Sequence, residues 1–166
     1  MKNREECVNE PLPSENAPAL RPWPQLLVGG AIILGLAVDL AMGTDRPDAL
    51  LTVIGGPLVV AGVLTNLWCA RMLREHGTPI QANRPATALV TDGPYFYSRN
   101  PIYVSYVALV FGLGLVLGSW TVTLLAPLVG VALHYLSVLP EERHLQQKFG
   151  AKYEQWASET PRWLFR

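Results

Sequence analysis

The segment "IYVSYVALVFGLGLVLGSWTVTLLAPLVGVALHYLSVL", residues 102–139, contains no Asp, Glu, Lys or Arg. Only the link "GSW" at 118–120 divides it, so each half is close to the ~20 residues that a helix needs to cross the hydrocarbon layer. Two upstream runs are also apolar and nearly free of charged residues. The four runs lie at about 25–43, 50–70, 102–118 and 121–139. We therefore predict an all-α integral membrane protein with four transmembrane helices, of which the third and fourth form a short antiparallel hairpin.

The charged residues predict the domain organisation and the orientation. Residues 1–22 are charged and proline-rich, which is typical of a disordered tail rather than a cleaved signal peptide. With four crossings, every Lys and Arg except Arg46 falls on one side of the membrane. The positive-inside rule places that side, with both termini and the 71–100 loop, in the cytoplasm. We expect residues 23–166 to form one domain in the membrane, the inner or plasma membrane if the source is bacterial.

The composition gives little support to nucleic acid or metal as a ligand. The formal net charge is zero, so nothing in it points to a nucleic-acid partner. The two cysteines, Cys7 and Cys69, have neither the placement of a structural disulfide nor the spacing of a zinc site. We expect membrane lipids as the surroundings, and neither nucleic acid nor metal as a ligand.

Among the polar residues inside the predicted spans, three are candidates for a specific role: Asp39, Asn66 and His134. Asp39 is near the outer end of its span, where we expect it to reach headgroup water. Asn66 suits an interhelical hydrogen bond. His134 shares a helical stripe with Ser137 and Glu141, so it is either a core histidine or a functional group.

A loop on the cytoplasmic side, "HGTPIQANRPATALVTDGPYFYSRNPIY" at 76–103, is rich in turn formers and aromatic rings. The rings suit an aromatic belt at the membrane interface, with Arg99 reaching the headgroups. That interpretation does not explain the prolines and glycines around the apolar "ALV" at 88–90, which predict fixed turns. We interpret the loop as a shaped wall of a binding site.

A second polar motif, "PEERHLQQKFGAKYEQW" at 140–156, follows the hairpin. Proline suits the first position of a helix, and the acids that follow suit its first turn. An apolar stripe then continues along the segment. Its members are Leu145, Phe149, Tyr153 and Trp156. We predict one amphipathic cytoplasmic helix over about 141–158.

The order "GPYFYSRNPIY", apolar hairpin, "EERHLQQKFGAKYEQW", "TPRWL" resembles the isoprenylcysteine carboxyl methyltransferase family, which is grouped with the phospholipid N-methyltransferases. The resemblance covers roughly residues 77–164. It implies an enzyme that uses S-adenosyl-L-methionine, held between the loop and the Glu141–Glu142 pair. By that resemblance, the cofactor-binding residues are Gln81, Thr87, Ala88, Leu89, Val90, Tyr95, Asn100, Pro101, Ile102, Tyr103 and Glu141.

The sequence departs from the carboxyl methyltransferases at two positions. Asn100 stands where those enzymes have histidine, and it can donate and accept hydrogen bonds but cannot titrate. Ser137 stands where they have an arginine that binds the substrate, so a prenylcysteine carboxylate lacks its expected counter-ion. The candidates for catalysis are Glu142, His134 and Arg99. Glu142 or His134 could take a proton from an amine acceptor.

These inferences lead to one function and several alternatives. The leading hypothesis is methyl transfer from S-adenosyl-L-methionine to a lipophilic or small hydrophobic acceptor, which enters from the bilayer at the cytoplasmic face. A phospholipid N-methyltransferase-like activity is the alternative within the same class. A membrane reductase that binds NADPH and a non-catalytic four-helix membrane scaffold are the alternatives outside it.

Overall fold

The computed structural model describes residues 23–43, 49–79 and 86–164. The predicted tail at 1–22 and the candidate Gln81 lie outside these ranges. The described residues are helical, with no strand among them. The elements are α1 (Trp23–Met42), α2 (Ala49–Glu75), α3 (Pro94–Tyr97), α4 (Pro101–Leu117), α5 (Trp120–Leu133), the π-helix η1 (His134–Val138), α6 (Leu139–Phe149) and α7 (Ala151–Glu159).

Three stretches of helix in the described residues are long and apolar enough to cross a membrane: 24–42, 50–75 and 120–149. The last combines α5, η1 and α6 into one continuous rod. These spans agree with the predicted membrane localisation. The apolar helix α4 has 17 residues and is shorter than the other three. The count of four transmembrane helices therefore stays a prediction.

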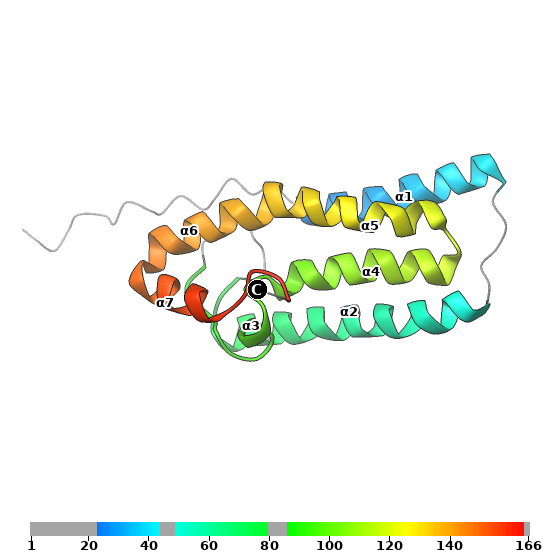
Figure 1. Ribbon diagram of the computed structural model, residues 1–166. Coiled ribbons are helices and arrows are strands. Elements are labelled where there is room, and N and C mark those ends of the chain that lie inside the picture. The colour runs from blue at the N-terminus through cyan, green and yellow to red at the C-terminus, as the bar shows by residue number, and fades with distance from the viewer. Residues whose placement is uncertain (1–22, 44–48, 80–85, 165–166) are drawn as a thin grey trace, which may run out of the picture.

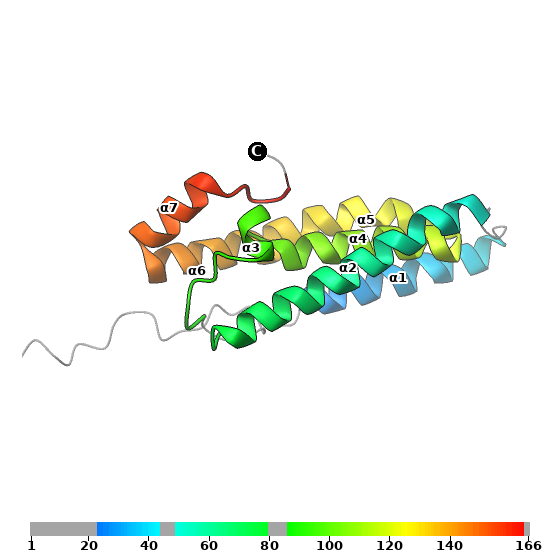
Figure 2. The same cartoon turned by 90° about the horizontal axis from the view of Figure 1, so that it is seen from below.

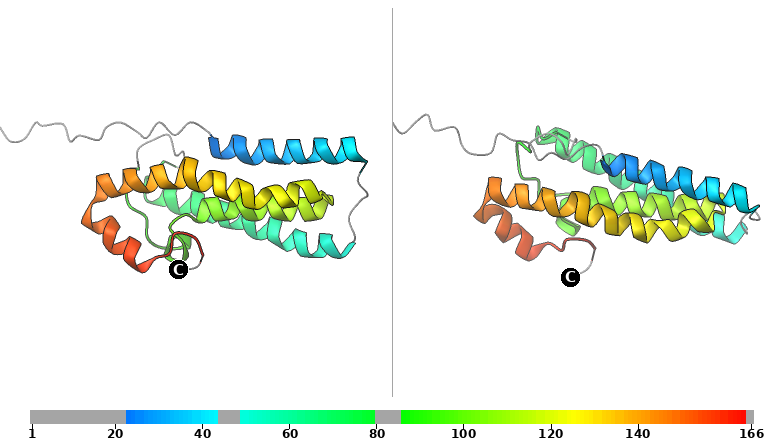
Figure 3. Two further views of the ribbon diagram at one scale, coloured as in Figure 1. Left: turned by 45° about the horizontal axis from the view of Figure 1, so that its top comes forward. Right: turned by 90° about the horizontal axis from the view of Figure 1, so that it is seen from above.

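The long helices pack side by side in the order α2, α4, α5, α1, with α4 between α2 and α5 (Figure 1). Views from other sides show that α2 crosses α4 at an angle and that α1 lies along α5 (Figures 2 and 3). Close approach requires small residues in the central helix. A Cβ added at Gly112 would lie 3.0 Å from the carbonyl oxygen of Gly55 on α2. One added at Gly114 would lie 2.6 Å from the backbone nitrogen of Thr123 on α5.

The link between α4 and α5 is short because both helix ends are capped within it. Gly118 ends α4 with a φ of 67°, a left-handed conformation that glycine adopts at no steric cost. Ser119 then caps α5, since its Oγ accepts a hydrogen bond from the backbone N–H of Val122 at 3.0 Å.

Two of the polar residues within the spans connect helices. The Asn66 side chain donates to Ser105 Oγ on α4 at 3.0 Å, as predicted for an interhelical hydrogen bond. Asp39 accepts a hydrogen bond from Thr121 at the start of α5 and is only 9% exposed. Asp39 therefore helps to join α1 to α5, and its contact with headgroup water stays a prediction.

The predicted single helix over 141–158 is two helices. Gly150, with φ 52° and ψ −127°, ends α6 and begins α7. This conformation is open to glycine and strained for other residues, so the chain turns there. As a result α7 folds back from the end of α6 toward α3 (Figure 2).

Candidate functional site

The candidate site lies at one end of the bundle, where α3, the first turn of α4, the start of α6, α7 and the C-terminal segment meet (Figure 1). Its first contact joins the two polar motifs. Tyr103 on α4 is 5% exposed, and its Oη donates a hydrogen bond to Glu141 Oε2 at 2.8 Å. No other hydrogen bond to Glu141 is formed by the described residues, so its second oxygen is available to a ligand.

Glu142 is held differently, because both of its oxygens are already bound. The side-chain amide of Asn100 donates to Oε1 at 3.1 Å. Arg162 donates to Oε2 from Nε at 2.9 Å, and its second nitrogen lies 2.9 Å from the same oxygen. Arg99 contributes a longer ion pair of 3.6 Å to Oε1. At 8% exposure, Glu142 is therefore a buried anchor with two cations around it.

The C-terminal strap, residues 160–164, completes this arrangement. Its backbone carbonyls accept three hydrogen bonds from the turn that precedes α4. The N–H of Arg99 donates to the Pro161 carbonyl at 2.9 Å, while Ser98 Oγ and the Asn100 amide each donate to the Arg162 carbonyl at 3.2 Å. Arg162, in the segment "TPRWL", was not predicted to have a role in the site. The available signal was a basic residue downstream of the acidic pair, within the stretch that carries the family resemblance.

Beneath these polar contacts lies a cluster of apolar and aromatic side chains. Its buried members are Cys69, Leu73, Val90, Tyr95, Tyr153 and Trp156. Leu89 and Ile102, both predicted to contact a cofactor, pack against it. Burial raises the pKa of Tyr95 well above its usual range, so this phenol stays neutral. Val90 and Tyr95 were both predicted to contact the cofactor. At least one face of each side chain packs against the protein core instead.

The remaining predicted loop residues are attached to the end of α2. The N–H of Ala88 donates to Thr78 Oγ1 at 3.0 Å, and Thr87 Oγ1 donates to the carbonyl of Gly77 at 2.7 Å. Pro101 is buried at the start of α4, where its ring suits the first helical position. Thr87 is exposed, whereas Ala88 is half-buried.

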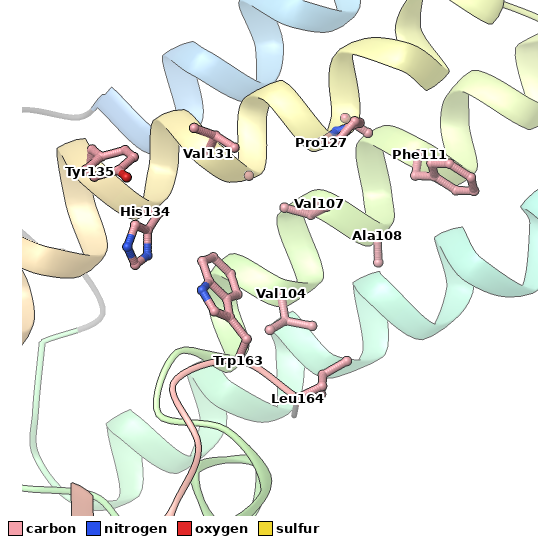
Figure 4. Close-up of a pocket in the computed structure, with 12 residues that line it drawn as sticks. Val104, Val107, Ala108, Phe111, Pro127, Val131, His134, Tyr135, Trp163 and Leu164 are labelled. Atoms are coloured by element: carbon pink, nitrogen blue, oxygen red, sulfur yellow. The ribbon is translucent and has the colours of Figure 1, made fainter. Parts of the chain in front are cut away.

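His134 is not brought to the acidic pair by any hydrogen bond. It lies on η1, with its ring 6.1 Å from that of Trp163 in the strap. Its Nδ1 is buried and has no hydrogen-bond partner among the described residues. Both rings line an apolar groove of about 780 Å³ between α4, α5 and the strap (Figure 4).

The residues around Glu141 fit S-adenosyl-L-methionine in chemical type. A carboxylate with a free oxygen can accept from an amino group or from ribose hydroxyls. Arg99 Nε is buried without a hydrogen-bond partner and can donate to the ligand's carboxylate.

Comparisons with known proteins concern the family of this chain. The phospholipid methyltransferase family profile matches residues 50–152, which include α2, α4, α5 and the acidic pair. The protein-S-isoprenylcysteine O-methyltransferase of Schizosaccharomyces pombe is 38% identical over 73 residues, 44% of this chain and 31% of that protein. No solved structure matches the chain.

Two further relatives are named for metal resistance. The nickel-cobalt-cadmium resistance protein NccN of Alcaligenes xylosoxydans xylosoxydans is 34% identical over 114 residues, 69% of this chain and 49% of that protein. The cobalt-zinc-cadmium resistance protein CzcN of Cupriavidus metallidurans is 29% identical over 135 residues, 78% of this chain and 58% of that protein.

The aligned part is thus between about a third and three fifths of each relative's length. The family profile, in contrast, covers more than half of this chain and includes both polar motifs. The chain therefore belongs to the phospholipid methyltransferase family, alongside the isoprenylcysteine methyltransferases that it resembles.

Proposed function

We propose that this protein transfers a methyl group from S-adenosyl-L-methionine to a lipophilic acceptor at the cytoplasmic face of the membrane. The observation that supports this most strongly is the contact between Tyr103 and Glu141 at 2.8 Å. It joins the aromatic turn and the acidic pair, the two motifs between which members of this family are expected to hold the methyl donor.

The protein's contribution to such a reaction is to orient the reactants. When bound, S-adenosyl-L-methionine supplies an electrophilic methyl group on a sulfonium. Glu141 binds the amino group or ribose hydroxyls, and Tyr103 fixes the carboxylate through its hydrogen bond. Glu142, Asn100 and Arg162 hold the turn, α6 and the strap together. Positioning of this kind can contribute up to ~7–11 kcal/mol to catalysis.

Binding of S-adenosylhomocysteine tests the proposal directly. Calorimetry on the full chain in lipid nanodiscs should give a measurable dissociation constant. Replacing Glu141 by Gln removes the charge that receives the ligand and should weaken binding about tenfold, since a hydrogen bond to a charged group contributes ~1.5–3 kcal/mol. Glu75→Gln, at an exposed carboxylate paired with Arg71 on α2, is the matched control and should bind like the native protein.

Two comparisons separate this function from its rivals. Binding of NADPH in preference to S-adenosylhomocysteine would favour a reductase, and binding of neither would favour a scaffold. Incubation with a radiolabelled methyl donor and a lipid extract, followed by chromatography, then identifies the acceptor. A labelled amino-headed phospholipid would favour the N-methyltransferase alternative. The metal-resistance names of NccN and CzcN do not by themselves identify an acceptor for this chain.

A further inference from the structure

The groove beside His134 is built from two apolar stripes at helical spacing. On α4 the stripe is Val104, Val107, Ala108 and Phe111, and on α5 and η1 it is Ala126, Pro127, Gly130, Val131, His134 and Tyr135. Trp163 and Leu164 of the strap close one side (Figure 4). At 1.5 Å per helical residue, each stripe extends for about 10–12 Å. A volume of about 780 Å³ is in the range of sites that enclose a small-molecule ligand.

The lining determines what kind of molecule can occupy the groove. Its walls belong to helices that we place in the hydrocarbon layer, and nearly all of their side chains are apolar. Such a groove accepts a hydrocarbon chain that enters sideways from the bilayer. Gly130 keeps it open, because a Cβ there would lie 3.3 Å from Val107 across the groove.

One end of the groove carries a polar group with no partner. His134 Nδ1 is buried and makes no hydrogen bond to the described residues, although a buried ring nitrogen normally has one. A ligand hydroxyl can supply that bond with either tautomer of the ring, since it both donates and accepts, and an amine head can donate to Nδ1 in the tautomer that leaves this nitrogen unprotonated.

The charges around this end disfavour an anionic head. Among the described residues, no Lys or Arg lines the groove. Arg162 is next to Trp163 in the chain, but its guanidinium is bound to Glu142. Arg99 pairs with Glu142 through Nη1 and does not line the groove, so its unpaired Nε does not serve a head beside His134. A carboxylate beside His134 would therefore lose water without gaining a free cation, which is unfavourable.

The groove shares two residues with the surroundings of the candidate site. Tyr103, Leu133 and Val138 belong to a buried cluster, and Val107 and Trp163 pack against it while also lining the groove. Val107 and Trp163 thus link the groove to the cluster that contains Tyr103, the partner of Glu141.

From these contacts we propose that the groove binds the methyl acceptor, and that this acceptor has a single hydrocarbon chain and a hydroxyl or amine head placed beside His134. This inference rests on the proposed function, and it specifies the substrate class: a carboxylate-headed acceptor is selected against. The groove walls recognise the chain, and the imidazole recognises the head.

Photolabelling with three probes tests the proposal. Decanol, decylamine and decanoate, each with a diazirine near the end of the chain, are added to the full chain in phosphatidylcholine nanodiscs, and labelled peptides are identified by mass spectrometry. Labelling is corrected for partition into nanodiscs that lack protein. We expect label on 104–111 and 126–131, with the alcohol and the amine at least tenfold above the carboxylate.

Variants separate groove binding from general contact with lipid. Ala108→Phe fills the groove and should reduce labelling at least fivefold, whereas Ala37→Phe on the exposed surface of α1 should not change it. His134→Leu should reduce labelling by the alcohol and the amine, because the ring that binds the head is removed, while labelling by the carboxylate stays low. Label spread evenly over all lipid-facing helices, or a preference for decanoate, would overturn the proposal.

Failure of this inference and failure of the proposed function can be told apart. Ala108→Phe should still bind S-adenosylhomocysteine with native affinity, because Ala108 lies about a turn and a half along α4 from Tyr103. Native binding of S-adenosylhomocysteine with no labelling in the groove would reject only the groove. Selective labelling without S-adenosylhomocysteine binding would reject only the methyltransferase.

Discussion

At the scale of single residues, the two neighbouring glutamates have different tasks. Glu141 has one internal partner, Tyr103, and keeps an oxygen for a ligand. Glu142 is bound by Asn100, Arg162 and Arg99, which leaves it little capacity to act as a base. Its assignment as a catalytic residue stays a prediction, and the contacts favour a role in positioning the turn and the strap.

Replacing Glu142 by Ala should destabilise the fold. The change leaves Arg99 and Arg162 without their anion at a site where the Glu142 side chain is 10% exposed. Breaking such a buried pair lowers the free energy of unfolding by ~3 kcal/mol. Thermal unfolding in detergent should show a clear drop in the midpoint. Glu75→Ala breaks a surface pair with Arg71, worth at most ~1 kcal/mol, and serves as the control. Equal midpoints for the two variants would contradict the anchoring role.

Resemblance to a family identified part of this site, and only part. It predicted that Tyr103 and Glu141 would lie together, and they do. It noted that Asn100 could donate where histidine is usual, and Asn100 does donate, to Glu142. Arg162 was missed, because its partner is distant in the chain and only the fold-back of the strap brings the two together.

At the scale of elements, the contact of α4 with its neighbours depends on glycine. Gly114→Ala should weaken the packing of α4 on α5, because the new methyl would lie 2.6 Å from the Thr123 backbone nitrogen, which cannot move without its helix. Overpacking of this kind costs ~1–3 kcal/mol. Gly56→Ala on α2, where no atom lies within 4 Å of the added Cβ, is the control. The thermal midpoints of both variants in detergent are compared with that of the native protein. A native midpoint for Gly114→Ala would show that α4 and α5 pack less closely than the described distances indicate.

The break between α6 and α7 offers a second test at this scale. Gly150→Ala should cost ~1–3 kcal/mol through backbone strain alone, because no atom lies within 4 Å of the added Cβ and only the φ of +52° opposes it. Gly29→Ala within α1, also with open space around it, should be neutral or stabilising. The helical content of both variants, followed by circular dichroism during heating, distinguishes them. A Gly150→Ala variant as stable as the native chain would indicate one continuous helix.

The π-helix η1 explains why the helical stripe through His134, Ser137 and Glu141 was a poor guide. The N–H of Leu139 bonds the carbonyl of His134, five residues back, and this shifts the faces of the helix relative to α-helical spacing. Pro140 follows immediately and has no N–H to offer the ordinary bond. His134 consequently lines the groove, while Glu141 bonds Tyr103.

At the scale of the whole molecule, the orientation in the membrane is a prediction that labelling can test. Single cysteines at Met42 and Leu117, the last residues of α1 and α4, should react with a membrane-impermeant maleimide added to intact cells. Cysteines at His76 and Lys148 should react only after the membrane is opened. The native Cys7 and Cys69 are first replaced by Ser and Ala. Labelling of position 117 from the inside would contradict four crossings.

By itself, the sequence determined the helices and their apolar character, because the ~20-residue runs and their charge distribution are local properties of the chain. The tertiary structure alone decided which helices are neighbours and the closure of the strap on Glu142. It also decided that His134 faces a groove. These features depend on contacts between residues far apart in the chain, such as Asn100 with Glu142 and His134 with Trp163, and no local pattern specifies them.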